Sequence, residues 1–504
     1  MISFTPFFPA FVVLLLMSLR GMRGWLAAVA LAAFFQGATP FVLGGAARDA
    51  GLAPAYLLLP IGVWHYLRWR MPLAGRARDL PLTPAHWALI AFTAVGVAGA
   101  VLLPRLFAGE VLVLPSRAQR FLRMEPVMPQ GTNLFQGFYL VMNYALFALV
   151  ARFVSSGRAD EAGLRKWVVR GAVLSALVGL YQWGGSFVGA YWPSEFFNSN
   201  TGVIQLGEQQ AMGFRRISST FIEPSVLGYH FAGCLGLMLF SARHARAGLL
   251  LLAVLLLSLA SSGYVIVAGL TAAWLVIGQA PAERKRSIFI ALLLLGLAGL
   301  AADFVFADGR LFQSLILDKG ASESGQVRAT WNLMAWESFA QSWGLGAGVG
   351  SARGSSFVAT LAATMGLPGL ALFALFLWRA IRAGLAEREA TGQGYGFALI
   401  AFSLGWCLAM PDLSLPLVWI CAGAAAGLQL DAARRAGEAA GEAPLSAAGV
   451  PAGPPARPGM AAGRPGWHDG RAAPAASAAA RPAQARTAWQ APPAEPATPR
   501  GAPT

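Results

Sequence analysis

Runs of about 20 apolar residues recur along this chain as far as residue 430, and no other feature constrains its fold as strongly. A helix that crosses about 30 Å of hydrocarbon at 1.5 Å per residue needs that many apolar residues. The sequence predicts thirteen such helices, several of them short. Their expected ranges are 4–19, 24–44, 53–67, 84–104, 133–151, 168–190, 225–242, 247–260, 262–278, 287–307, 355–378, 396–410 and 413–430.

Composition supports a membrane protein. Of the 504 residues, 56% are apolar and only 12% are charged, whereas soluble domains carry about a quarter charged residues. Most soluble enzymes are thereby excluded. We expect an all-α fold in which a polytopic bundle of 12–13 transmembrane helices spans residues 1–430.

The run from residue 248 to residue 277 is the hardest to divide. A single helix of that length would be about 45 Å long, which exceeds the thickness of a bilayer even with tilt. We therefore expect a break at Ser261, Ser262 and Gly263.

The distribution of basic residues predicts the orientation. Alternate connections hold nineteen basic and six acidic residues, while the others, up to Asp412, hold eleven and twelve. Because basic residues concentrate on the cytoplasmic side, the N-terminus is expected outside and the C-terminus inside. The net charge of +15 is then explained by orientation, and no nucleic acid partner is expected. The longest connections, 105–132, 191–224 and 308–354, are expected outside.

The segment 431–504 differs from the rest of the chain. It is dominated by Ala, Pro, Gly and Arg, a composition typical of disorder. We interpret it as a disordered cytoplasmic tail, which is either a dispensable extension or a docking segment for a cytoplasmic partner or anionic lipid.

Arginines on the outer side need a local reason, since basic residues are unexpected there. All but one of the eleven outer basic residues are Arg, whose rigid fork binds phosphate oxygens in a bidentate way. The densest cluster holds Arg215, Arg216, a hydroxyl run that includes Ser219, and Glu223, just before Pro224 opens a helix. It predicts an anion site with a base. The alternative is a capped helix in which Glu223 only pairs with one of these arginines.

The last outer connection holds a second candidate element. Arg328 precedes a run with glycine at every second position, including Gly348 and Gly350, and then Arg353. Such glycines let backbone N–H groups approach a ligand, although the spacing is not a dinucleotide fingerprint. A simple flexible loop is the alternative.

Other polar residues are less informative. Arg117, Arg120 and Arg123 recur at every third residue and are expected to bind phospholipid head groups. The five histidines, His230 among them, are scattered without metal-ligand spacing. No metal or other cofactor is expected.

Three segments together resemble the O-antigen polymerase and ligase superfamily of bacterial membranes. They are Arg216–Ser225, the Arg328…Trp331 element, and Gly346…Gly350 leading into Ser355–Ala359 and Gly366–Gly369. The resemblance covers about residues 170–430. It implies a multi-pass inner-membrane protein with a periplasmic N-terminus, whose periplasmic loops bind undecaprenyl-pyrophosphate-linked glycans. It also implies that Arg215 or Arg216, Arg328 and Arg353 handle the pyrophosphate.

The sequence departs from the family pattern at two places. Ser261–Tyr264 stands where many members carry an arginine, and residues 308–354 lack the histidine typical of ligases. The missing histidine favours a polymerase.

We therefore expect a metal-independent glycosyltransferase that joins repeat units of an exopolysaccharide or O-antigen. Arg215, Arg216 and Arg328 would stabilise the leaving pyrophosphate while Glu223 orients or deprotonates the acceptor, and Arg353, Ser219, Gly348 and Gly350 would bind substrate. Expected partners are membrane lipid and polysaccharide export or chain-length regulator proteins. An O-antigen ligase, a lipid-linked glycan flippase and a non-catalytic export scaffold are the alternatives.

Overall fold

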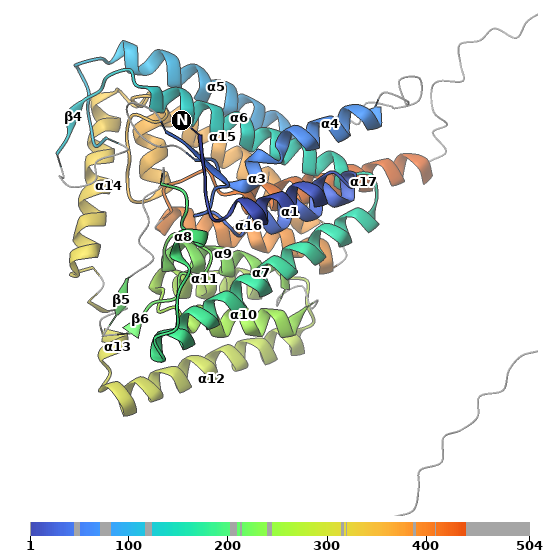
Figure 1. Ribbon diagram of the computed structural model, residues 1–504, viewed down its shortest axis with the longest axis vertical. Helices are drawn as coiled ribbons and strands as arrows, with labels where there is room; N and C mark the ends of the chain where they lie inside the picture. Colours follow the sequence, from blue (N-terminus) through green and yellow to red (C-terminus); the bar gives the residue numbers. More distant parts are fainter. Residues whose placement is uncertain are drawn as a thin grey trace, which may run out of the picture. The chain divides into compact units, whose positions relative to one another are not determined.

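A computed structural model describes residues 2–44, 51–70, 82–115, 123–201, 209–211, 214–238, 244–313, 317–318, 320–386, 390–408 and 410–439. These residues form mostly α-helix and belong to one of two units of the chain (Figure 1). The other unit, Ala447–Thr504, lies outside the described residues together with most of the expected tail.

The helices and strands follow one another along the chain with short connections. The helices are α1 (Phe8–Ser18), α2 (Met22–Ala32), α3 (Pro54–Leu57), α4 (Leu59–Arg70), α5 (Pro84–Leu106), α6 (Gly131–Val154), α7 (Arg158–Phe187), α8 (Ser194–Phe197), α9 (Pro224–Met238), α10 (Ala245–Leu257), α11 (Ser261–Ile277), α12 (Ala282–Ala307), α13 (Arg310–Phe312), α14 (Glu323–Gln341), α15 (Phe357–Ala386), α16 (Ala390–Leu408) and α17 (Pro416–Ala439). The described strands form antiparallel pairs: β1 (Ile2–Phe4) with β2 (Phe41–Leu43), β3 (Leu112–Val113) with β4 (Glu125–Pro126), and β5 (Gln210–Ala211) with β6 (Phe214–Arg215).

Several helices have the length and composition of membrane spans. Among the described residues, α5, α6, α12, α15 and α17 are long and apolar enough to cross a bilayer. Helices α1, α2, α10 and α11 are apolar but shorter. The expected mostly helical fold is thus confirmed, and the membrane-length helices agree with a membrane protein.

The expected helix 24–44 is only half formed. Helix α2 ends at Ala32, and the following residues contact the segment around α8 instead. The Gly37 carbonyl accepts the Asn200 N–H, and the Thr39 N–H donates to Ser199 Oγ at 3.0 Å. The chain then pairs as β2 with β1. Hydropathy alone did not reveal that these polar partners compete with helix formation.

The division of the run 248–277 is confirmed. Helix α10 ends at Leu257 and α11 begins at Ser261. A Cβ on Gly228, near the start of α9, would lie 3.2 Å from Gly263 Cα, near the start of α11. The end of α9 and the end of α11 both reach the start of α16. Helices α9 and α11 therefore run in the same direction, and α10 runs back between them.

Helix α15 folds back on itself, which the expected single span 355–378 did not include. Gly366 has φ 62° and ψ −157°, outside the helical region. The rings of Phe357 and Phe373 lie 4.8 Å apart, whereas sixteen residues of straight helix would separate them by about 24 Å. Residues 357–365 thus form a short arm packed beside the longer one, and the turn lies at Gly366.

The expected tail also begins later than residue 431. Helix α17 continues to Ala439, and buried Asp431 receives ion pairs from Arg434 at 2.6 Å and Arg435 at 2.9 Å. These pairs join successive turns of one helix. The arginines that made this segment look like tail therefore extend the last helix.

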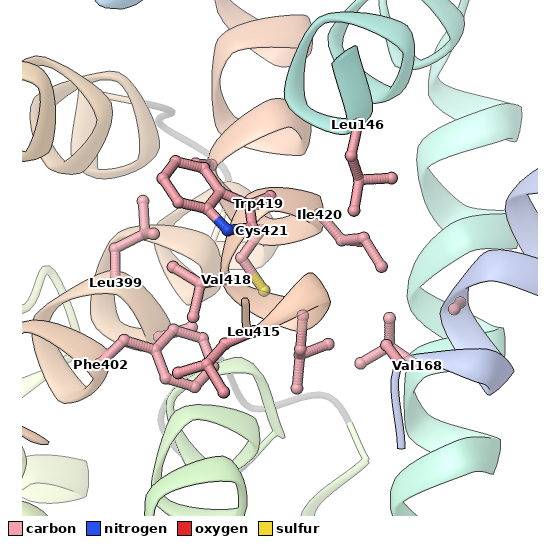
Figure 2. Close-up of a cluster of buried hydrophobic side chains, with 14 of the residues drawn as sticks. Leu146, Val168, Leu399, Phe402, Leu415, Val418, Trp419, Ile420 and Cys421 are labelled. Atoms are coloured by element: carbon pink, nitrogen blue, oxygen red, sulfur yellow. The ribbon is translucent and has the colours of Figure 1, made fainter. Parts of the chain in front are cut away.

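The core is centred on α17. Figure 2 shows its side chains meeting those of α6, α7 and α16, and all the labelled residues are fully buried: Leu146, Val168, Leu399, Phe402, Leu415, Val418, Trp419, Ile420 and Cys421. Gly423 and Gly427 lie one turn apart on α17 against α6. A Cβ on either glycine would come within 2.6 Å of a backbone oxygen, that of Phe147 or Ala151. Such small-residue faces allow close approach of helix backbones.

Helix α14 runs crosswise to α5 and α12, at one end of the long helices (Figure 1). Its far end is joined to the connection that follows α5, because Ser338 Oγ donates to the Leu112 carbonyl at 2.8 Å and Gln341 Oε1 accepts the Leu112 N–H at 2.7 Å. The Arg353 N–H donates to the Leu114 carbonyl at 3.1 Å. Described residues of two connections expected outside, 105–132 and 308–354, are therefore hydrogen-bonded to each other.

Candidate functional site

The hydroxyl run before α9 is held in place by α7. Gln182 Oε1 accepts the N–H groups of Ser218 at 2.9 Å and Ser219 at 2.8 Å, and its Nε2 donates to Ser218 Oγ. Ser219 has a positive φ of 53°, and its hydroxyl donates to the Ser175 carbonyl. Gln182 and Ser175 are seven residues apart, so they lie on one face of α7. These hydrogen bonds thus fix the backbone and the side chains of Ser218 and Ser219.

Ser219 was expected to bind substrate. The structure places it with its side chain fully buried and its hydroxyl already bonded to α7. It therefore shapes the loop, and a direct contact with a ligand would require the loop to open.

Arg216 reaches into the break between α10 and α11. Its guanidinium donates to the Leu259 carbonyl at 3.0 Å, the Ser258 carbonyl at 3.5 Å and Gln209 Oε1 at 2.8 Å. The last carbonyls of a helix lack internal partners and form the negative end of its dipole, so this position favours a cation. Arg216 thus fills the helix break between α10 and α11.

Burial and neighbouring charges act on Arg216. Desolvation lowers its pKa from the ordinary value, the negative charge of Glu223 acts in the opposite direction, and the positive charge of Arg328 adds to the lowering. A guanidinium nonetheless stays protonated. Glu223, seven residues along the chain, and Arg328, more than a hundred residues away in sequence, are therefore both within electrostatic reach of Arg216.

Glu223 lies at the start of α9 and is half-buried. Its carboxylate accepts a hydrogen bond from Ser225 Oγ. Among the described residues it forms no ion pair with Arg215 or Arg216, contrary to the alternative in which it serves only as their partner. The Glu223 carboxylate can therefore accept further hydrogen bonds, and its charge acts on Arg216.

Arg215 lies on β6, over the ring of Trp192 at 5.9 Å. Its Nε is buried without a hydrogen-bond partner among the described residues. A buried donor left unpaired costs about 1–3 kcal/mol. An anionic acceptor placed here would remove that cost.

Helix α14 positions Arg328 and Arg353. Ser322 caps the helix by accepting the Gly325 N–H at 3.2 Å. One turn after Arg328, Asn332 Oδ1 accepts the N–H groups of Ser355 at 2.8 Å and Ser356 at 3.0 Å. These bonds hold the segment after Arg353 against α14.

The guanidinium groups of Arg328 and Arg353 have no hydrogen-bond acceptor among the described residues. Arg353 lies over the ring of Trp331 at 5.4 Å, and Trp331 Nε1 is buried without a hydrogen-bond partner in the described part of the chain. Arg328 forms no hydrogen bond or ion pair with any described residue and is half-buried. Its five donors remain available for an external acceptor.

The alternating glycines pack closely. Gly344, Gly346, Gly348 and Gly350 all have positive φ. A Cβ on Gly348 would lie 2.5 Å from Pro104 Cδ, and one on Gly350 would lie 2.6 Å from the Thr132 carbonyl oxygen. The Gly348 N–H donates to the Thr364 carbonyl at 2.9 Å. Gly348 and Gly350, expected to bind substrate, here join the loop to the ends of α5 and α6, and the Gly348 N–H would have to leave its partner to reach a ligand.

Two other predicted features remain. Arg117 and Arg120 are outside the described residues. His230 is fully buried, stacks on Phe221 at 4.5 Å and binds the Val226 carbonyl through Nδ1 at 2.8 Å. It belongs to the core of α9.

Gln182, Gln209 and Asn332 are the site residues that sequence reasoning missed. Each carries an amide side chain that bonds another segment, which is distant in sequence for Gln182 and Asn332 and seven residues away for Gln209. The only signal was an amide inside or beside an apolar run, which by itself names no partner.

The cluster suits an anion with several oxygens. Arg215, Arg216, Arg328 and Arg353 are all half-buried, and among the described residues none forms an ion pair with a carboxylate. Unpaired positive charge in a partly desolvated place attracts phosphate strongly. Comparison with protein-family models and with curated proteins finds no match for this chain.

Proposed function

We propose that this protein is a polytopic membrane glycosyltransferase that polymerises undecaprenyl-pyrophosphate-linked repeat units at the periplasmic face of the bacterial inner membrane. The observation that carries the proposal is the group of four half-buried arginines that have no carboxylate partner among the described residues and lie at one end of apolar helices. A diphosphate joined to a lipid brings charge and hydrocarbon to the same boundary. The resemblance to the O-antigen polymerase and ligase superfamily supports the same substrate class.

The proposed reaction is glycosyl transfer without a metal. The acceptor hydroxyl oxygen attacks the anomeric carbon of the donor glycan and forms a new carbon–oxygen bond. The bond between that carbon and the diphosphate oxygen breaks, and its electron pair leaves with the diphosphate. Arg328 and Arg215 stabilise the developing charge, while Arg216 adds its fixed charge from the helix break. The proton of the hydroxyl passes to the Glu223 carboxylate and then to water.

Sidedness gives a direct prediction. In a background with Cys407, the exposed cysteine, replaced by serine, we expect Gln210→Cys and Gln326→Cys to react with a membrane-impermeant maleimide on intact spheroplasts. Both positions are exposed beside the arginines. Ala282→Cys, at the other end of the helices, should react only after lysis. If the cysteines at positions 210 and 326 did not react with the maleimide on intact spheroplasts, a periplasmic reaction would be excluded.

Lipid-linked glycan profiling of a deletion strain tests the reaction itself. A polymerase predicts that single repeat units remain on the carrier and long chains disappear. Full-length chains stranded on the carrier would instead indicate a ligase, and units facing the cytoplasm would indicate a flippase. An unchanged profile would leave only a scaffold or an unrelated role.

A further inference from the structure

A carboxylate outside the arginine cluster has no partner that the structure describes. Asp412 lies on the connection between α16 and α17 and is half-buried. It forms no hydrogen bond or ion pair through its carboxylate with any described residue. Isolated charges among apolar helices are costly, so such a group is a candidate for function.

The backbone around Asp412 is fixed. Trp406 Nε1 donates to the Asp412 carbonyl at 3.1 Å. Asn143 Nδ2 and Trp419 Nε1 donate to the Leu413 carbonyl at 3.2 Å and 2.8 Å. With three side chains engaged by its main chain, this connection holds the carboxylate in a defined place.

Aromatic side chains lie near the connection that carries Asp412. Asn143, which donates to the Leu413 carbonyl, accepts the Tyr56 hydroxyl through Oδ1 at 2.6 Å. The rings of Tyr56 and Tyr139 lie 5.4 Å apart, and those of Phe135 and Tyr139 lie 5.2 Å apart. A carboxylate close to tyrosine side chains offers the few polar groups on an apolar wall that orient a bound ligand.

Asp412 lies at the same end of the helices as the arginines. Gly405, two turns before it, packs against Tyr229 near the start of α9. Trp406 packs against Phe357 at 5.3 Å, directly after the serines that Asn332 of α14 holds. Trp406, whose indole donates to the Asp412 carbonyl, thus joins this connection to the short arm of α15, which α14 also contacts.

We propose that Asp412, with Tyr139, binds the hydroxyls of the acceptor sugar in a subsite separate from the arginine cluster. The proposal rests on the proposed glycosyl transfer, in which the arginines take the donor diphosphate and an uncharged sugar needs its own acceptors. A carboxylate accepts hydrogen bonds from two neighbouring hydroxyls at once. The same carboxylate repels a diphosphate, so the charged donor and the uncharged acceptor are directed to different subsites.

Variants of the full-length protein test the subsite. Asp412→Asn keeps the shape but weakens acceptance from hydroxyls, and we expect single repeat units to accumulate on the carrier in cells. Farnesyl diphosphate, used as a soluble probe of the arginine cluster, should bind the purified variant in nanodiscs within twofold of the wild type. Tyr139→Phe removes one hydroxyl and should shorten the chains. Asp308→Asn, which changes an exposed carboxylate at the same end, is the control and should leave both readouts unchanged.

The outcomes separate the two proposals. Normal chains from Asp412→Asn, with none from Arg328→Ala, would overturn the subsite and leave the polymerase standing. Normal chains from both variants would overturn both. Loss of farnesyl diphosphate binding or of membrane abundance in Asp412→Asn would assign Asp412 to the diphosphate site or to folding, and the subsite would again be wrong.

Discussion

Replacing Arg328 by alanine is expected to abolish long glycan while the protein accumulates in the membrane as before. The side chain has no hydrogen-bond or ion-pair partner among the described residues, so its removal leaves no internal group unpaired. Loss of one preorganised donor to a developing negative charge costs a factor of about 10²–10³ in rate. Chain-length analysis of lipid-linked glycan in a complemented deletion strain measures the effect.

Arg310→Ala is the matched control. Arg310 lies on the same expected outer connection but is exposed and paired with Asp308 at 2.8 Å, and exposed pairs contribute about 0–1 kcal/mol. We expect normal chains from it. Normal chains from Arg328→Ala as well would remove Arg328 from the reaction.

Arg216→Ala is a less direct test. This side chain also binds the carbonyls that end α10, so its removal should lower stability as well as activity. Unchanged abundance is therefore expected for Arg328→Ala and not for Arg216→Ala.

The largest effect on stability is expected at Gly366. A Cβ there would lie 2.1 Å from the Gly344 carbonyl oxygen, and φ and ψ fall in a region that only glycine adopts readily. Gly366→Ala should therefore cost about 3 kcal/mol or more and prevent the two arms of α15 from packing. Thermal stability in detergent, followed by the fraction of monodisperse protein after heating, measures this change.

Gly296→Ala provides the comparison. Gly296 lies within α12 with nothing within 4 Å of the added Cβ, and alanine in a helix is favoured over glycine by about 0.5–1 kcal/mol. We expect equal or slightly higher stability. Equal stability of the Gly366 and Gly296 variants would contradict the folded-back arm.

Patterns within single segments predicted much of the fold. Hydropathy located α5, α6 and α11 closely, because transfer of a side chain from water to an apolar medium depends mainly on that side chain. Helix length likewise required the break before Ser261. Only the structure shows that Gly423 and Gly427 face α6.

The sequence singled out Arg216, Arg328 and Glu223 as candidate site residues, and their role stays a prediction. The structure adds that Glu223 and Arg328 both lie within electrostatic reach of Arg216. The sequence did not predict that Gly348 and Ser219 are engaged inside the protein, or that Asp412 has no described partner. The surroundings of Gly348 and Asp412 depend on contacts between segments more than a hundred residues apart. Those of Ser219 depend on contacts between α7 and the loop before α9.

The amino-acid sequence by itself thus determined the helical class, most helix positions and the excess of arginine in the long connections. Each of these follows from local composition and length. The tertiary structure alone decided which arginines have donors without a described acceptor and where α15 turns back. It also decided which carboxylates form no ion pair with those arginines. Those properties are set by what fills the space around each group, and a chain specifies that space only once it has folded.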